Sequence, residues 1–273
     1  MPPSSAPKVL IFDIGGVCVV SPFQAILDYE KSHDIPVGYI NSAISFSKPN
    51  GSWQKLERGE VPLDAAWFAA WKNDILNPAA WKAFHSKNSR QTSNSSSSSS
   101  SSPGSQSPLQ RLPPLPTDLD AADLYWTMMA VSRHPDPFMA PALRKLKQTG
   151  AYRLAALSNT SIFPPDHPYT VRGADDITRV FDVFVSSAHV GMRKPDREIY
   201  EFTLQAVRRR WPEAGIEAAD VVFFDDIGEN LKMAREVGWR TVKVGLGGTQ
   251  EAVRELERIT GEKLLEGAGR AKL

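Results

Sequence analysis

The stretch Val9-Leu10-Ile11-Phe12-Asp13-Ile14-Gly15-Gly16-Val17 decides the fold of this chain. Its first four residues are wholly apolar and end at a carboxylate, which is typical of a short strand buried on both faces of a parallel sheet. We expect four further short strands at 152–157, 181–186, 221–224 and 240–244. Because amphipathic helical segments separate these strands, the pattern predicts an α/β fold with a doubly wound parallel sheet.

The composition is that of an ordinary globular protein. The 273 residues include 32 Lys and Arg against 31 Asp and Glu, a formal charge of +1, and 41% are hydrophobic. This near balance argues against nucleic acid or a membrane surface as a partner. The longest apolar stretch, residues 9–20, contains Asp13 and is too short to span a bilayer. The single cysteine, Cys18, cannot form an internal disulfide, which favours a reducing, intracellular compartment.

The strand pattern divides the chain into two units. Residues 1–20 plus 135–273 are expected to form the α/β core, and residues 21–134 a helical module inserted after the first strand. Inside this module, a segment at about 86–117 is rich in Ser, Asn, Gln and Pro and contains eight consecutive serines at 95–102. Such a segment buries too little apolar surface to offset its ordering entropy, so we expect a disordered insertion.

Polar side chains follow the predicted strands at the points where the strands end. In an open parallel sheet, ligands bind beyond the carboxyl ends of the strands, so these side chains should converge. They are Asp13, Ser158, Asn159, Arg193, Lys194, Asp225 and Asp226. Three carboxylates that meet need a cation, and hard oxygen ligands suit Mg²⁺. A hydroxyl, an amide and an ammonium suit the oxygens of phosphate, and a carboxylate can attack phosphorus to form an aspartyl phosphate.

Four segments resemble, in order and approximate spacing, the four motifs of the haloacid dehalogenase (HAD) superfamily. They are FDIGGV at 12–17, LSNT at 157–160, GMRKPD at 191–196 and FDDIGEN at 224–230. The helical module is similar to the cap domain that this family inserts after its first motif. The segment WQKLERGE at 53–60 resembles the cap of the subgroup that contains the N-terminal phosphatase domain of soluble epoxide hydrolases. The resemblance implies a Rossmann-like core and a phosphatase that acts on a small phosphorylated metabolite.

The same resemblance implies a role for each residue at the motif positions. Asp13 would be the nucleophile of an aspartyl-phosphate mechanism. The phosphoryl oxygens would be held by Ser158, Asn159 and Lys194. The ligands of Mg²⁺ would be Asp13, the Gly15 carbonyl and Asp226, with Asp225 as a further ligand or directly behind the ligands.

Gly15 departs from the motif of the phosphatases. These enzymes usually carry a second aspartate there, which protonates the leaving group and then activates water. General acid–base help is worth about 10²–10⁴ in rate, so we expect slow turnover of ordinary alkyl phosphates. Two alternatives stay open. The chain could be a non-catalytic member that binds phosphorylated ligands or partners, or a dehalogenase in which Asp13 attacks carbon, although adjacent Asp225 and Asp226 favour a metal and hence the phosphatase.

Three weaker features accompany the motifs. His189 could replace the missing acid or base, although a single loop histidine is more often simply exposed. Gly245 to Gly248 could hold phosphate, but an ordinary strand-to-helix turn is the preferred interpretation. The cap also contains five tryptophans, most of which are expected to pack between helices, while a wall against the leaving group is the alternative. They are Trp53, Trp67, Trp71, Trp81 and Trp126.

The chain ends in Ala271-Lys272-Leu273, which resembles the Ser-Lys-Leu peroxisomal address. The resemblance implies the peroxisomal import receptor as a partner and the peroxisomal matrix as the location. The alternative is a cytoplasmic protein whose C-terminus is merely frayed and basic.

Overall fold

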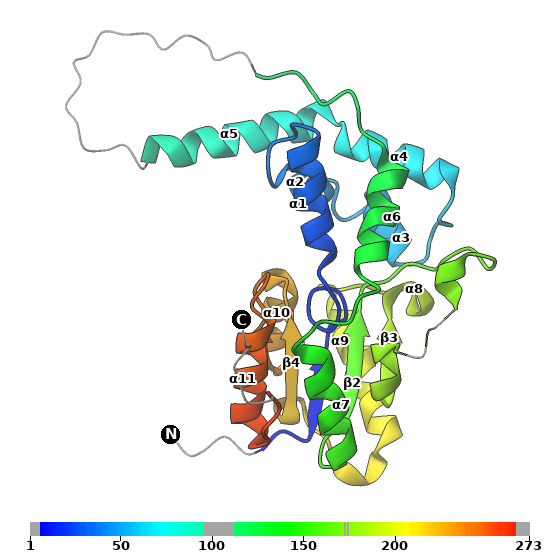
Figure 1. The fold of residues 1–273 in the computed structure, drawn as a ribbon, viewed down its shortest axis with the longest axis vertical. Coiled ribbons are helices and arrows are strands. Elements are labelled where there is room, and N and C mark those ends of the chain that lie inside the picture. The colour runs from blue at the N-terminus through cyan, green and yellow to red at the C-terminus, as the bar shows by residue number, and fades with distance from the viewer. Residues whose placement is uncertain (1–5, 95–111, 172, 174, 266–273) are drawn as a thin grey trace, which may run out of the picture.

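The computed structural model describes residues 6–94, 112–171, 173 and 175–265. Its centre is a five-stranded parallel sheet in the order β3-β2-β1-β4-β5 (Figure 1). The strands are β1 (Val9–Phe12), β2 (Arg153–Ser158), β3 (Val183–Ser186), β4 (Val221–Asp225) and β5 (Arg240–Lys243). The first strand lies in the middle, and later strands add on both sides of it, as a doubly wound sheet requires. The predicted fold class is confirmed.

Alternate residues of β1 point to opposite faces of the sheet, and each face has its own hydrophobic cluster. Leu10 and Phe12 belong to one cluster, and Val9 and Ile11 to the other. The helices that complete the first cluster are α7 (Met139–Thr149) and α11 (Thr249–Thr260). Those that complete the second are α9 (Arg197–Arg210) and α10 (Gly228–Glu236). The sheet is therefore covered on both faces, and its carboxyl edge is left for the site.

Helices α1 to α6 form a cap above the carboxyl ends of the strands (Figure 1). They are α1 (Pro22–Ser32), α2 (Tyr39–Phe46), α3 (Ser52–Glu57), α4 (Ala65–Ile75), α5 (Pro78–Asn94) and α6 (Ala121–Val131). A third hydrophobic cluster lies within the cap, where Trp67, Trp71 and Trp81 are buried. The prediction that most of the tryptophans pack between helices is confirmed for these three.

The remaining helical elements are short connections of the core. They are α8 (Ser187–Val190) and the 3₁₀ turns η1 (Pro168–Thr170), η2 (Ile177–Val180), η3 (Pro212–Ala214) and η4 (Ala218–Asp220). None of the helices in the described part of the chain is long and apolar enough to cross a membrane.

The chain enters and leaves the cap at one narrow junction. The Val20 N–H donates to the His134 carbonyl at 2.9 Å, and the Asp136 N–H donates to the Cys18 carbonyl at 2.9 Å. These cross hydrogen bonds hold the outgoing and returning segments side by side next to the loop that follows β1. The cap is thus anchored close to Asp13.

The described structure reaches into both ends of the serine-rich segment at 86–117, for which disorder stays a prediction. Helix α5 continues to Asn94. On the other side, Trp81 Nε1 donates to the Pro113 carbonyl at 2.8 Å, which anchors the returning chain to the cap. Residues 95–111, with all eight consecutive serines, lie outside the described residues, as does the C-terminal tripeptide 271–273.

Glu30 holds the start of α2 from inside the cap. The residue is 1% exposed, and its carboxylate accepts the N–H of Gly38 at 2.7 Å and the N–H of Ile40 at 2.8 Å. The side chain therefore satisfies two donors at a helix end that has no other intrahelical acceptor for them.

Replacing Glu30 by alanine should lower the free energy of unfolding by about 3 kcal/mol, because two part-buried donors lose a charged acceptor. Glu30→Gln keeps one acceptor oxygen and should lose roughly half as much. Asp28→Ala removes an exposed carboxylate from the same helix and serves as the control. Urea denaturation measures all three variants, and equal stability of Glu30→Ala and Asp28→Ala would contradict the assignment.

Candidate active site

The Lys194 ammonium lies between two carboxylates at the carboxyl ends of β1 and β4. Its Nζ is 2.9 Å from Asp13 Oδ2 and 2.7 Å from Asp225 Oδ2. Lys194 is only 1% exposed, and both aspartates are buried. Burial disfavours the ammonium, but attraction to the two carboxylates outweighs burial and raises the pKa of Lys194. The lysine is therefore charged at neutral pH.

Asp225 is committed to hydrogen bonds within the protein. Its Oδ1 accepts the Ile227 N–H at 2.7 Å and Asn230 Nδ2 at 3.0 Å, while its Oδ2 accepts Lys194. Because the residue is fully buried, the carboxylate orients Lys194 and Asn230 from behind the site.

Asp226 completes a cluster in which carboxylate oxygens of Asp13, Asp225 and Asp226 lie within 4.8 Å of one another. Burial raises the pKa of Asp13 to about 6, with Lys194 opposing this shift and Asp225 adding to it. Burial and repulsion by both other aspartates raise the pKa of Asp226 to about 8. Within the described part of the chain, the Asp226 carboxylate accepts no hydrogen bond from another residue. Three carboxylates against one ammonium leave a formal charge of −2, which a divalent cation would balance.

The two glycines after Asp13 differ in what the space around them allows. Gly16 has φ +74°, and a Cβ there would lie 2.4 Å from Asp226 Oδ2. The close approach of this backbone to Asp226 thus requires glycine. At Gly15 a Cβ would meet only the Pro22 ring, with Cδ at 3.5 Å and Cγ at 3.7 Å, which are ordinary van der Waals distances. The space at the Cβ position would therefore allow an aspartate at position 15.

The side chain of Asn159, just after β2, holds the backbone of Lys194. Its Oδ1 accepts the Lys194 N–H at 2.8 Å, and its Nδ2 donates to the Lys194 carbonyl at 3.0 Å. Ser158 is buried at the end of β2, and its Oγ donates to the Asn159 carbonyl at 3.4 Å. Asn159 is thus brought to the Asp13–Lys194 pair, whereas Ser158 lines a neighbouring cavity.

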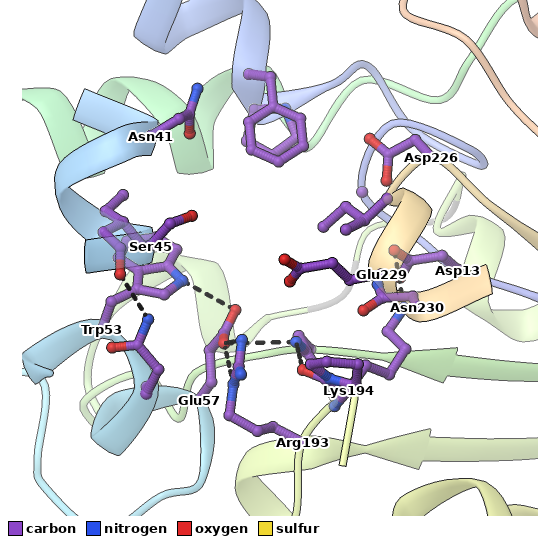
Figure 2. Close-up of a pocket in the computed structure, with 18 of the residues that line it drawn as sticks. Asp13, Asn41, Ser45, Trp53, Glu57, Arg193, Lys194, Asp226, Glu229 and Asn230 are labelled. Atoms are coloured by element: carbon purple, nitrogen blue, oxygen red, sulfur yellow. Dashed lines mark hydrogen bonds and ion pairs between the residues drawn. The ribbon is translucent and has the colours of Figure 1, made fainter. Parts of the chain in front are cut away.

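A cavity of about 590 Å³ separates the cap from these core residues (Figure 2). Its core side is lined by Asp13, Gly15, Asn159, Arg193, Lys194, Asp226, Glu229 and Asn230. Its cap side is largely apolar and includes Phe23, Ile26, Ile44, Trp53, Met128 and Met129. Figure 2 shows Asn41 and Ser45 of α2 across the cavity from Asp226 and Asp13. The charged floor of the cavity, formed by the core, thus faces a mainly apolar roof, formed by the cap, that carries a few polar groups.

Glu57, the last residue of α3, reaches from the cap to the core, and the sequence did not point to it as a site residue. Its Oε2 accepts Arg193 Nε at 2.7 Å and lies 2.7 Å from Arg193 Nη2, and its Oε1 accepts Trp53 Nε1 at 2.9 Å. The family-like segment at 53–60 was the available signal, since it contains both Trp53 and Glu57. It identifies the stretch of chain but not the core residue that the stretch contacts.

A second ion pair joins the cap and the core beside the cavity, and the sequence did not predict it either. Lys48, which follows α2, pairs with Glu229 at the start of α10. Both partners are more exposed than Glu57 and Arg193, so this pair contributes little to stability. Attraction to Lys48 lowers the pKa of Glu229.

A second cavity of about 700 Å³ adjoins the first at Gly15 and Asn159, which line both. His189 lies in this second cavity, where its Nδ1 is 2.7 Å from Ser186 Oγ. The histidine is exposed and does not line the cavity that contains Asp13. Gly245 to Gly248 line neither cavity, and a hydrogen bond from the Gly248 N–H to the Gly245 carbonyl closes an ordinary turn.

The structure combines a parallel sheet, a carboxylate–lysine group at the carboxyl edge of that sheet and an inserted cap. Together these features define a class of hydrolases with a Rossmann-like core. Residues 7–238 match the haloacid dehalogenase-like hydrolases, and the chain belongs to this family. The predicted family is confirmed, and the chain is a hydrolase of this family by homology.

The chain is similar to bifunctional epoxide hydrolase 2 of Rattus norvegicus, with 25% identity over 260 residues. This match covers 95% of the chain but only 40% of that protein. A sesquiterpene phosphatase of Aspergillus oryzae is 36% identical over 104 residues, which cover 38% of the chain and 47% of the phosphatase. The structure of a HAD-like hydrolase from Porphyromonas gingivalis superposes with a TM-score of 0.50 and 17% sequence identity, over 93% of this chain and 99% of the Porphyromonas chain. This similarity supports the fold alone.

Gly16→Ala should weaken divalent cation binding at the aspartate cluster, because its Cβ would displace the Asp226 carboxylate. Gly15→Ala is the matched control, since its Cβ has room. We expect Mg²⁺ to raise the melting temperature of the wild type and Gly15→Ala, and to raise that of Gly16→Ala by much less. Differential scanning fluorimetry against Mg²⁺ concentration measures this, and the same Mg²⁺ response in both variants would refute the role of the close approach.

Proposed function

We propose that this chain is a Mg²⁺-dependent phosphatase that acts on a small phosphorylated metabolite through an aspartyl-phosphate intermediate. The observation that carries the proposal is the buried Asp13–Lys194 pair, 2.9 Å apart, at the base of a cavity of about 590 Å³. Asp13 Oδ2 would attack phosphorus and form the new P–O bond as the bond to the leaving group breaks. Water would then hydrolyse the acyl phosphate, release phosphate and restore the carboxylate.

The donor set of the site fits Mg²⁺. Asp13, Asp226 and the Gly15 carbonyl would hold the ion, and Asp225 would support Lys194 and Asn230 from behind. These are hard oxygen ligands, and their surplus of two negative charges suits a dication. Mg²⁺ bound there would supply positive charge against the phosphoryl oxygens.

Lys194 would oppose the negative charge that develops on the transferring phosphoryl group. Its ammonium is already desolvated and held by two carboxylates, so it needs little reorganisation in the transition state. Asn159 fixes the lysine backbone with its side-chain amide and would thus contribute to binding the phosphoryl oxygens through Lys194, with Ser158 approaching from the second cavity.

The leaving group would lie under the cap. The apolar roof formed by Phe23, Ile26, Ile44, Trp53, Met128 and Met129 favours a leaving group with an apolar portion. The similarity to a sesquiterpene phosphatase is consistent with such a substrate. Without a carboxyl at Gly15, a leaving group that needs no proton, such as an aryl, anomeric or acyl oxygen, would depart most readily.

Gly15 also supports a second candidate function, the binding of a phosphorylated ligand without turnover. The Mg²⁺ and phosphate groups would then remain, while the step that needs an acid and base would be absent. Binding of phosphate esters by the wild type with no release of phosphate would favour this candidate.

Asp13→Asn should abolish Mg²⁺-dependent hydrolysis of an aryl phosphate, because the amide cannot act as the nucleophile. The protein should stay folded, since the amide remains close in size and retains an oxygen near Lys194. Phosphate release with and without Mg²⁺, together with a melting curve, measures both points. Activity at the wild-type level in Asp13→Asn would rule out the proposed mechanism, and chloride release from a haloacid would point to dehalogenation.

Gly15→Asp should accelerate hydrolysis of alkyl phosphates by about 10²-fold or more, because it restores the acid and base. Aryl phosphates should gain much less, since their leaving groups need little protonation. Gly15→Asn, which has the same size but no acid, is the control. The ratio of alkyl to aryl rates is the measurement, and an equal ratio in all three proteins would show that Gly15 does not limit the reaction.

A further inference from the structure

Glu57 is a cap carboxylate buried against the core at the edge of the phosphate site. The residue is 9% exposed, and its core partner Arg193 is 8% exposed. Four donors surround the carboxylate. Trp53 Nε1 donates to Oε1 at 2.9 Å, and Oε2 accepts Arg193 Nε at 2.7 Å and Asn159 Nδ2 at 3.4 Å. Arg193 Nη2 lies 2.7 Å from the same Oε2 as an ion pair. Figure 2 shows Glu57 next to Arg193, with Lys194 close by.

Both core partners of Glu57 act directly on the segment that carries Lys194. Arg193 precedes Lys194 in the chain. Asn159 holds the Lys194 backbone through its N–H at 2.8 Å and its carbonyl at 3.0 Å. A continuous set of contacts therefore runs from α3 of the cap, through Glu57, to the backbone of the lysine whose ammonium lies against Asp13.

We propose that Glu57 is a positioning residue that couples docking of the cap to the order of the phosphate site, because it fixes Arg193 and Asn159 and, through them, Lys194. This inference rests on the proposed phosphatase function. With the cap docked, the Arg193 and Asn159 side chains share a carboxylate acceptor. With the cap displaced, both lose that acceptor, and the Lys194 segment loses part of its support.

The burial of the pair favours this role over simple attachment of the cap. Removing two charges from water is costly, and an apolar contact of the same size would hold two surfaces together at least as well. The Lys48–Glu229 pair also bridges cap and core, but it is exposed and contacts neither Asn159 nor the Lys194 backbone. A buried ion pair instead specifies one orientation, in which Glu57 meets Arg193 and Asn159 together.

The variant Glu57→Gln tests the coupling. Its kcat should fall about 10- to 100-fold, as is usual when a support of reactive groups is lost. The loss should be the same for aryl and alkyl phosphates, because the Lys194 segment contacts the phosphoryl group that all substrates share. Glu60→Gln is the matched control, since Glu60 lies three residues on and pairs with Arg58 at the surface. A kcat within twofold of the wild type, or a loss that depends on the leaving group, would overturn the proposal.

Glu57→Gln leaves Arg193 buried without a countercharge and could unfold. The double variant Glu57→Gln/Arg193→Gln removes both charges and keeps the proposal testable. We expect its melting temperature to recover towards the wild type while its kcat stays as low as that of Glu57→Gln. Recovery of kcat together with stability would show that Glu57 has only a structural role.

Hydrogen exchange at residues 193–194, measured on the full chain without substrate, separates this inference from the proposed function. Exchange there should be faster in Glu57→Gln than in the wild type and Glu60→Gln. The Lys194 N–H donates to Asn159 Oδ1, and Asn159 is held less firmly when the Glu57 carboxylate is removed. If the wild type hydrolyses no phosphate ester, the proposed function fails, and this comparison still tests the coupling. Equal exchange in the two variants would overturn it.

Discussion

One buried ammonium organises the reactive end of this molecule. The Lys194 side chain is almost wholly removed from water and is stable there only because Asp13 and Asp225 lie within 3 Å of its charge. The two aspartates lie at the carboxyl ends of β1 and β4, which are neighbouring paired strands, so the sheet places one carboxylate on each side of the ammonium. One ammonium still leaves the carboxylate cluster with Asp226 short of positive charge, so the arrangement that buries the lysine also creates a site for a cation.

The core and the cap divide the work of the site. The parallel sheet brings loops from distant parts of the chain to one edge, where their side chains converge on Asp13. The cap adds an apolar roof and, through Glu57, a buried charged contact with the core. Because the cap joins the core at a single junction near Asp13, a small displacement of its helices would alter this contact and the cover of the cavity together.

Much of the fold and the core side of the site could be predicted. Short apolar runs such as 221–224 have few alternatives to a buried strand, and the residue after such a strand lies at the carboxyl edge. What the sequence missed also has a physical reason. The extent of α5 and the hydrogen bond from Trp81 to the returning chain at Pro113 depend on packing, which composition does not reveal. Glu57 was missed because nothing in a helical segment tells which distant loop it will meet.

The sequence by itself determined the family, the parallel sheet and the identity of the carboxylates and lysine at its edge. Those features depend on local patterns of apolar and polar residues, and such patterns can be read along the chain. Only the tertiary structure decided that Asp225 lies behind Lys194, that Ser158 opens to a second cavity, and that Glu57 closes on Arg193. These depend on distances between residues far apart in the chain, and those distances are set by the pairing of the strands within the core and by the packing of the cap against the core.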